Sequence, residues 1–161
     1  MARMRAETAY SLIIVLLLAG LAFSVYAWYE SVNTAAQGVC SINSYVSCGK
    51  IDNSGHTTTL GIPDWAIGVA GYVVMIALGI LAYRTYKRQY LLALTAVSGL
   101  GLATSAYFAY LELVVIQGIC PICLGAYLCN VAALALMVYL VRLTSDAPEP
   151  APTKGSKPEA A

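Results

Sequence analysis

Residues 120–141, CPICLGAYLCNVAALALMVYLV, decide the fold of this chain. They contain no Asp, Glu, Lys or Arg. At the helical rise of about 1.5 Å per residue they can cross a hydrocarbon core, which takes about 20 residues. A Cys-Pro-Ile-Cys motif stands at the beginning of the stretch. The segment therefore predicts a transmembrane helix that begins with a pair of thiols at one membrane surface.

The rest of the chain has the same apolar character. Of its 161 residues, 60% are hydrophobic and 11% are charged, whereas about a quarter of the residues in soluble domains are charged. Three further stretches are long enough to span a bilayer. The sequence predicts an all-α membrane protein, a four-transmembrane-helix bundle with an extracytoplasmic capping loop between helices 1 and 2. The predicted spans are residues 10–29, 62–83, 90–117 and 121–141.

The basic residues predict the orientation. Eight of the nine lie before the first span, between the second and third, or after the fourth, and only Lys50 lies between the first and second. The positive-inside rule then puts both termini in the cytoplasm of a multi-pass cell-membrane protein, with residues 30–61 and the turn at 118–120 outside. A net charge of +1 provides no basic field for nucleic acid, so membrane lipid is the expected surrounding.

The chain is predicted to form one domain. Residues 1–143 are assigned to the four-helix transmembrane domain, whose cysteines, described next, predict a redox role. Residues 144–161 contain four of the six prolines and few apolar side chains, which predicts a disordered cytoplasmic tail. Residues 30–61 carry many turn-forming residues and no sustained helical or strand period, which is typical of a capping loop.

Cys120 and Cys123 are predicted to form a reactive pair. Pro121 suits the first turn of a helix, where its missing N–H costs nothing. Both sulfurs then lie near the free N–H groups of the helix N-terminus, where the helix dipole stabilises a thiolate. Their Cα atoms would be about 5 Å apart, within the range for a disulfide. Cys129, six residues further into the span, is predicted to be a small core hydrophobe.

Cys40 and Cys48 are the second pair on the outer side, where an oxidising compartment permits disulfides. On a straight helix they would stand about 12 Å apart, beyond the limit of about 7 Å, so they can bridge only if the segment between them bends. A loop that bends can also let Cys48 swing to Cys120, which suggests a relay. Two alternatives stay open, namely two structural disulfides and a metal site. The metal site fits less well, because zinc-binding pairs are separated by about two to four residues and no His lies beside either pair.

The ordered set of a loop pair followed by CxxC at the head of the fourth helix resembles the vitamin K epoxide reductase family. The resemblance covers nearly all of residues 10–141. It is carried by Cys40-Ser41-Ile42, Ser47-Cys48-Gly49, Gly61-Ile62-Pro63-Asp64, Glu112-Leu113-Val114-Val115-Ile116 and Cys120-Pro121-Ile122-Cys123 with Tyr127 beyond. The bacterial DsbB-type oxidases share the chemistry but carry their CxxC pair in the first loop, so they are the weaker match.

The resemblance implies a role for each cysteine of a catalytic set. Cys123 would face a quinone of ubiquinone or menaquinone type, Cys120 would exchange with Cys48, and Cys40 would meet a thioredoxin-like (DsbA-like) extracytoplasmic protein. Tyr127, one helical turn below Cys123, resembles the family tyrosine that borders the quinone and could donate a hydrogen bond to its carbonyl.

Two further residues complete the candidate cofactor site. Asp64 stands where the family commonly has an asparagine that hydrogen-bonds the quinone, and an ionised Asp accepts but cannot donate. Glu112 would lie about 12 Å below Cys120 if the third helix ran straight. An intramembrane carboxylate is costly, so we expect Glu112 either to deliver protons or to bond a neighbouring helix.

The resemblance implies a membrane thiol–disulfide oxidoreductase that reduces a quinone, oxidises a thioredoxin-like partner and supports disulfide-bond formation. Ser41 replaces the usual acidic residue, and the loop from Cys48 to Asp64 is shorter than in animal members. Both departures favour plain quinone reduction over epoxide chemistry. The alternatives are a non-catalytic scaffold with structural disulfides and a DsbB-like oxidase.

Overall fold

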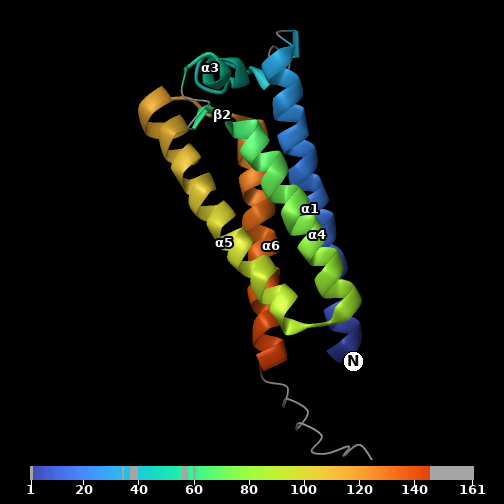
Figure 1. Ribbon diagram of the computed structural model, residues 1–161. Helices are drawn as coiled ribbons and strands as arrows, with labels where there is room; N and C mark the ends of the chain where they lie inside the picture. The colour runs from blue at the N-terminus through green and yellow to red at the C-terminus, as the bar shows by residue number, and fades with distance from the viewer. Residues whose placement is uncertain (1, 34, 37–39, 56–57, 60, 146–161) are drawn as a thin grey trace, which may run out of the picture.

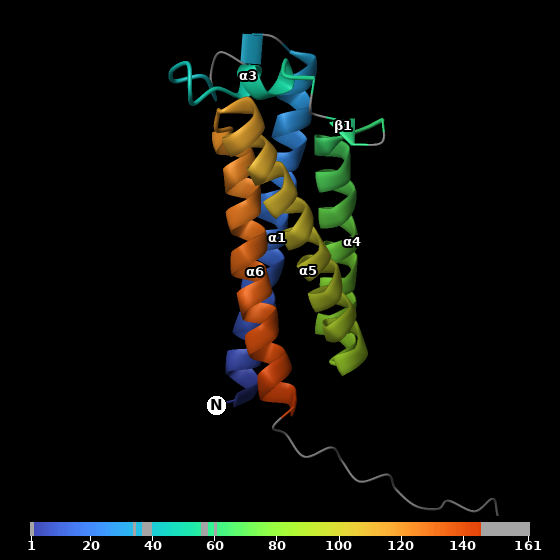
Figure 2. The ribbon, with the colours of Figure 1, turned by 90° about the vertical axis from the view of Figure 1, so that its left-hand side faces the viewer.

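The computed structural model describes residues 2–33, 35–36, 40–55, 58–59 and 61–145 of the chain. Four long helices, α1, α4, α5 and α6, run side by side as a bundle (Figures 1 and 2). Each is long and apolar enough to cross a membrane. The predicted four-helix transmembrane bundle is therefore confirmed. Their bounds are α1 Ala2–Val32, α4 Asp64–Thr85, α5 Arg88–Tyr110 and α6 Pro121–Ser145.

The bundle is apolar on its outside as well as in its core. Fully buried side chains such as Ile13, Leu17 and Leu94 pack where the helices meet. Large aliphatic side chains such as Leu100 and Leu128 are exposed on the outer faces. A helix that is hydrophobic all round suits a surrounding of lipid, in which only internally hydrogen-bonded backbone is stable. In this bundle α1 packs against α4 and α6, and α5 packs against the same two helices.

Both ends of the second span differ in detail from the prediction. Ile62 and Pro63 do not begin the helix but form strand β2 (Ile62–Pro63), which pairs antiparallel with β1 (Thr58–Thr59). The helix starts at Asp64, directly after a proline that cannot donate to a preceding turn. It ends at Thr85, and the next residue, Tyr86, takes a left-handed conformation and donates its N–H to the Ala82 carbonyl at 2.9 Å.

The third span ends in a widened turn. After α5 the chain continues as a π-helix, η1 (Leu111–Ile116), and then reverses at Gln117, whose φ is 53°. The N–H of Gly118 returns to the Glu112 carbonyl at 2.9 Å. A Cβ on Gly118 would lie 3.2 Å from the Lys50 side chain, so glycine allows the capping loop to approach closely. The segment leading to α6 therefore folds back over Glu112.

The capping loop lies across one end of the bundle, here called the capped end (Figures 1 and 2). Its short helix α3 (Cys48–Asp52) is capped by Ser47, whose Oγ accepts the Lys50 N–H at 3.3 Å. Val46 forms a parallel bridge with Ile119. The Ser47 N–H donates to the Ile119 carbonyl at 3.1 Å, so the backbone before Cys48 is fixed to the backbone before Cys120.

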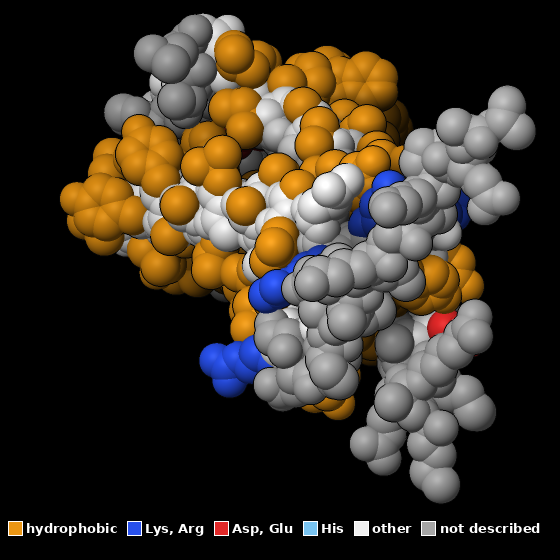
Figure 3. All heavy atoms as spheres, turned by 60° about the horizontal axis from the view of Figure 1, so that its bottom comes forward, with side chains coloured by type: hydrophobic (Ala, Val, Ile, Leu, Met, Phe, Trp, Pro, Cys, Tyr) orange, Lys and Arg blue, Asp and Glu red, His pale blue; other side chains and the backbone are white. Residues whose placement is uncertain are grey.

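The beginning of α1 and the end of α6 lie together at the end opposite the capping loop (Figure 1). Figure 3 looks at this end and shows Lys and Arg side chains gathered there. Helix α6 reaches Ser145, two residues beyond the predicted domain boundary. Residues 146–161, which make up most of the predicted disordered tail, lie outside the described residues.

Candidate active site

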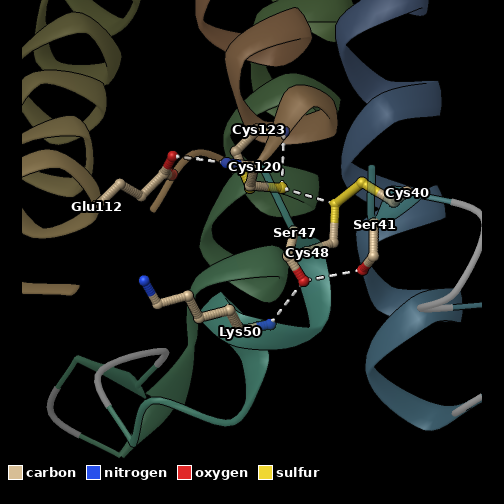
Figure 4. Close-up of a disulfide and its surroundings, with 8 residues drawn as sticks. All are labelled: Cys40, Ser41, Ser47, Cys48, Lys50, Glu112, Cys120 and Cys123. Atoms are coloured by element: carbon tan, nitrogen blue, oxygen red, sulfur yellow. Dashed lines mark hydrogen bonds between the residues drawn. A yellow bond between two sulfur atoms is a disulfide. The ribbon is translucent and has the colours of Figure 1, made fainter. Parts of the chain in front are cut away.

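Cys40 and Cys48 form a disulfide with their Cα atoms 5.7 Å apart (Figure 4). The segment between the two cysteines bends, and the Asn43 side chain stabilises this bend. The Asn43 carboxamide oxygen accepts the N–H of Tyr45 at 2.9 Å and that of Val46 at 2.8 Å. The Ile42 N–H closes the turn on the Val46 carbonyl at 2.9 Å. The turn brings together two cysteines that a straight helix would hold apart.

The sulfur of Cys48 also touches the second cysteine pair. Its Sγ lies 3.3 Å from the Sγ of Cys120, which is a free thiol (Figure 4). Both residues are buried, with 2% and 3% of their surfaces exposed. The backbone bridge between Val46 and Ile119 lies just before each of the two cysteines and keeps their backbones side by side. Cys48 therefore already lies against Cys120, and the swing expected from the sequence is not needed for contact.

Cys120 and Cys123 occupy the start of α6 as predicted. The N–H of Cys123 donates to the sulfur of Cys120 at 3.3 Å, and the N–H of Leu124 donates to the Cys120 carbonyl at 3.0 Å. Free N–H groups at a helix N-terminus stabilise negative charge. The first turn of α6 thus directs a backbone N–H at the sulfur of Cys120.

An apolar cavity of ≈ 220 Å³ opens below Cys123. Its walls come from all four membrane helices and carry several aromatic rings and a few polar groups. Cys123, Tyr127 and Asp64 line this cavity, so three of the predicted site residues share one space. Other lining residues are Phe23, Trp65 and Phe108. An apolar slot with convergent polar groups is typical of a site for a small aromatic ligand.

Glu112 is close to both the cysteine pair and the cavity. Its Oε2 accepts the Cys120 N–H at 3.2 Å, and its Oε1 accepts the Tyr127 hydroxyl at 2.9 Å. The separation of about 12 Å expected from a straight helix is therefore wrong. The π-helical turn and the left-handed Gln117 fold the chain back, so that Cys120 lies beside the Glu112 carboxyl. Glu112 reaches the cavity through Tyr127.

Asp64 uses one carboxylate oxygen locally. Its Oδ1 accepts the N–H of Trp65 at 2.7 Å, at the start of α4. The Trp65 ring packs against Trp28 of α1 with centroids 6.1 Å apart. Asp64 is thus the first residue of α4 and also lines the cavity.

Two residues near the site were not assigned a role from the sequence. Lys50 donates from Nζ to the Gln117 carbonyl at 2.7 Å and so joins α3 to the turn after η1. Burial and the nearby charge of Asp64 raise the pKa of Asp52 to about 6. The only sequence signal was that Lys50 is the single basic residue of the loop; Asp52 had none.

Three of the sulfurs, those of Cys40, Cys48 and Cys120, lie within 4.8 Å of one another. Such a cluster could hold a metal ion if all three were thiolates. Because Cys40 and Cys48 are joined to each other, only Cys120 of the three offers a thiol here. The arrangement is one for sulfur-to-sulfur exchange.

A disulfide in contact with a free CxxC pair at the head of a membrane-spanning helix defines a membrane thiol–disulfide oxidoreductase. The chain belongs to the vitamin K epoxide reductase family, whose sequence model matches residues 11–138. No curated protein sequence matches the chain. The family assignment confirms the resemblance seen in the sequence and makes the protein a multi-pass membrane oxidoreductase of a family that uses quinones.

Proposed function

We propose that this protein oxidises the dithiol of a thioredoxin-like (DsbA-like) extracytoplasmic protein, reduces a membrane quinone, and so supports disulfide-bond formation. The observation that carries the proposal is the position of Cys48. Its sulfur is bonded to the sulfur of Cys40 and lies 3.3 Å from the sulfur of Cys120. The sulfurs of the loop are therefore in contact with the CxxC pair of α6, the helix whose Cys123 lines the cavity.

The relay begins with the partner. One partner thiolate attacks Cys40, and Cys48 leaves as a thiolate; the second partner thiolate then releases Cys40 and leaves the partner oxidised. Cys48 attacks Cys120 of a Cys120–Cys123 disulfide, and Cys123 leaves as a thiolate. Cys40 then attacks Cys48 and releases Cys120, and the released Cys120 and Cys123 thiolates take up the two protons that the partner dithiol has lost. Each step exchanges one S–S bond for another, and one electron pair moves inward.

The cysteine pairing in the structure corresponds to one stage of this cycle. Cys40 and Cys48 are oxidised while Cys120 and Cys123 are free thiols. This is the state after the loop has passed its electron pair inward and before the pair leaves for the cavity. The order of the two pairs along the chain favours this family over a DsbB-like oxidase.

The cavity suits the head group of a quinone of ubiquinone or menaquinone type. Its aromatic and aliphatic walls fit a flat, apolar ring, and Cys123 and Tyr127 lie on the wall. A quinone bound there supplies a two-electron acceptor. Cys123 would present its sulfur to it, and Tyr127 could donate its hydroxyl to a quinone carbonyl, whereas Asp64 could donate only in its protonated form. Ser41, in place of the usual acidic residue, and the short loop from Cys48 to Asp64 favour quinone over epoxide as substrate.

The proposed orientation has both termini in the cytoplasm and the capping loop outside the cell membrane. The α4–α5 turn and the end of α6, which carry basic residues, lie at the end opposite the capping loop (Figure 1). An extracytoplasmic loop would be reached by exported proteins, and an oxidising compartment permits the disulfide.

Turnover with purified components tests the proposal. The protein in quinone-containing liposomes should oxidise a reduced thioredoxin-fold dithiol and reduce quinone in equal amounts. Cys123→Ser should abolish both, whereas Cys129→Ser, a matched change six residues further along the same helix, should abolish neither. Absence of turnover with both ubiquinone and menaquinone would contradict the proposal.

A further inference from the structure

Glu112 is a buried carboxyl group between the two halves of the site. It is 6% exposed and lies in the π-helical end of the third span. Burying a carboxylate at membrane depth costs several kcal/mol, so such a residue normally has a function. Its two oxygens hold two different parts of α6, the Cys120 N–H at the helix start and the Tyr127 hydroxyl further in.

The same carboxyl group is in contact with the thiol chemistry. The Cys123 side chain lies close enough to act electrostatically on Glu112 and Cys120, and the N–H of Cys123 donates to the Cys120 sulfur at 3.3 Å. The titratable groups that act on Glu112 are Cys123 and Tyr127 of α6 and Asp64 of α4. In Figure 4 the carboxyl points at the start of α6, beside the two cysteines. The Glu112 carboxyl group therefore lies beside the Cys123 thiol, whose proton must be removed.

Closing the Cys120–Cys123 disulfide removes two protons as well as two electrons. A thiol must lose its proton to become a nucleophile or electron donor. An ionised Glu only accepts hydrogen bonds, whereas a protonated Glu also donates one. Protonation of Glu112 would therefore reverse its bond with Tyr127. The Tyr127 hydrogen, which now points at Glu112, would turn to the cavity that the same residue lines.

We propose that Glu112 takes the proton of Cys123 and passes it through Tyr127 to the ligand in the cavity. The S–H bond of Cys123 breaks as an O–H bond forms on Glu112. Glu112 then donates to Tyr127, which gives its own hydroxyl proton to the cavity and is reprotonated by Glu112. Cys120 then gives its proton to the neighbouring Cys123 thiolate, and Cys123 passes this second proton on by the same path. Two electrons and two protons leave as the disulfide closes, and they are the two electrons and two protons that a quinone takes up.

This inference rests on the proposed function for the identity of the acceptor, but its test does not need a quinone. The probe is iodoacetamide, with mass spectrometry of Cys123 in quinone-free protein whose CxxC pair is reduced. In the wild-type protein the Cys123–Glu112 pair shares one proton, so the alkylation rate should be nearly flat from about pH 6 to about pH 8. In Glu112→Gln, which keeps the size and an acceptor oxygen, the rate should rise about tenfold per pH unit.

Two further variants separate proton transfer from structure. Tyr127→Phe keeps the aromatic ring and should keep the flat alkylation profile while quinone reduction falls. Ser98→Ala removes another buried hydrogen bond between the third and fourth spans, from Ser98 Oγ to Asn130 at 2.8 Å, and should leave the profile flat. In quinone turnover Glu112→Gln should be about 100-fold slower, the lower end of what a positioned acid–base group contributes.

A purely electrostatic or structural Glu112 gives a different result. Its negative charge would then only oppose thiolate formation, so Glu112→Gln would react faster than the wild type at every pH, with the same slope in both proteins. That outcome would overturn the inference. If the proposed function failed because no quinone was reduced, the alkylation profiles would still decide the role of Glu112.

Discussion

The two cysteine pairs are held in different ways, and the difference separates their tasks. Cys40 and Cys48 are brought together by an irregular turn that depends on the Asn43 side chain. Cys120 and Cys123 are held by the first turn of a membrane helix, with Cys123 on the wall of an apolar cavity. A loop can be approached by a soluble protein, whereas a helix start at the membrane can be approached by a lipid-soluble molecule. Each pair therefore suits one partner.

The largest expected effects come from removing one cysteine of each pair. Cys123→Ser should reduce quinone turnover to background with every donor, because the electron pair has no exit. Cys40→Ser should stop oxidation of a thioredoxin-fold protein but spare turnover with dithiothreitol, which can enter at Cys48 or Cys120. Parallel assays with the two donors check this. Equal loss with both donors in Cys40→Ser would mean that the two pairs do not have separate tasks.

A smaller, selective effect is expected in the turn. Asn43→Ala removes two hydrogen bonds that close it, each worth about 1 kcal/mol. The loop pair should then close less readily, and protein-donor turnover should fall by roughly tenfold while turnover with dithiothreitol changes little. Asn53→Ala, which removes an exposed amide bonded to the Gly49 carbonyl, is the matched control. A loss with both donors would show that the turn also shapes the helix site.

A pH effect is expected at Asp52. Its folded-state pKa, raised to about 6 by burial and by Asp64, exceeds its ordinary value of 3.8. At pH values below 3.8 Asp52 is protonated in both the folded and the unfolded state and does not lower the free energy of unfolding. As the pH rises from there through about 6, the unfolded state ionises first, so the free energy of unfolding falls. Asp52→Asn should raise stability at pH 7 by about 1 kcal/mol after allowance for solvent screening, and should make no difference at about pH 4. Thermal melts at both pH values measure this. An equal gain at both would contradict the assignment.

The smallest effect is expected at a buried pair on α5 and α6 that includes Asn130, which lines the cavity. Ser98 and Asn130 form a buried pair of hydrogen bonds between α5 and α6. Ser98→Ala should lower stability by only about 0.6 kcal/mol, which is typical of hydrogen bonds between membrane helices. Turnover with both donors should stay at the wild-type level. Melting curves and the two assays check this prediction, and a turnover defect would tie this pair to the site.

The fold could be predicted because it depends on local composition. Each span is a long apolar run, and only the ends shifted, as where Pro63 delays the start of α4. The CxxC position followed from Pro121, which suits a first helical turn. These features need no knowledge of what lies beside them in space.

The contacts of the site could not be predicted in the same way because they join distant segments. Nothing local at Gln117 indicated a left-handed residue, since glycine is the usual choice there and follows at Gly118. Because the chain reverses at Gln117, Cys120 lies close enough to donate a hydrogen bond to Glu112 instead of standing about 12 Å away, as a straight helix would hold it. The bridge between Val46 and Ile119 likewise depends on tertiary packing.

The most direct test of the account is a crosslink between the two regions. A Cys40→Ser/Cys123→Ser variant retains Cys48 and Cys120, whose sulfurs lie 3.3 Å apart. After mild oxidation in the membrane, mass spectrometry should find these two residues joined in most molecules. A Cys40→Ser/Cys120→Ser variant, which retains Cys48 and Cys123, should stay mostly unlinked. If Cys48 joined Cys123 as readily as Cys120, or remained unlinked in both variants, the proposed path of electrons from the loop to the membrane helix would be wrong.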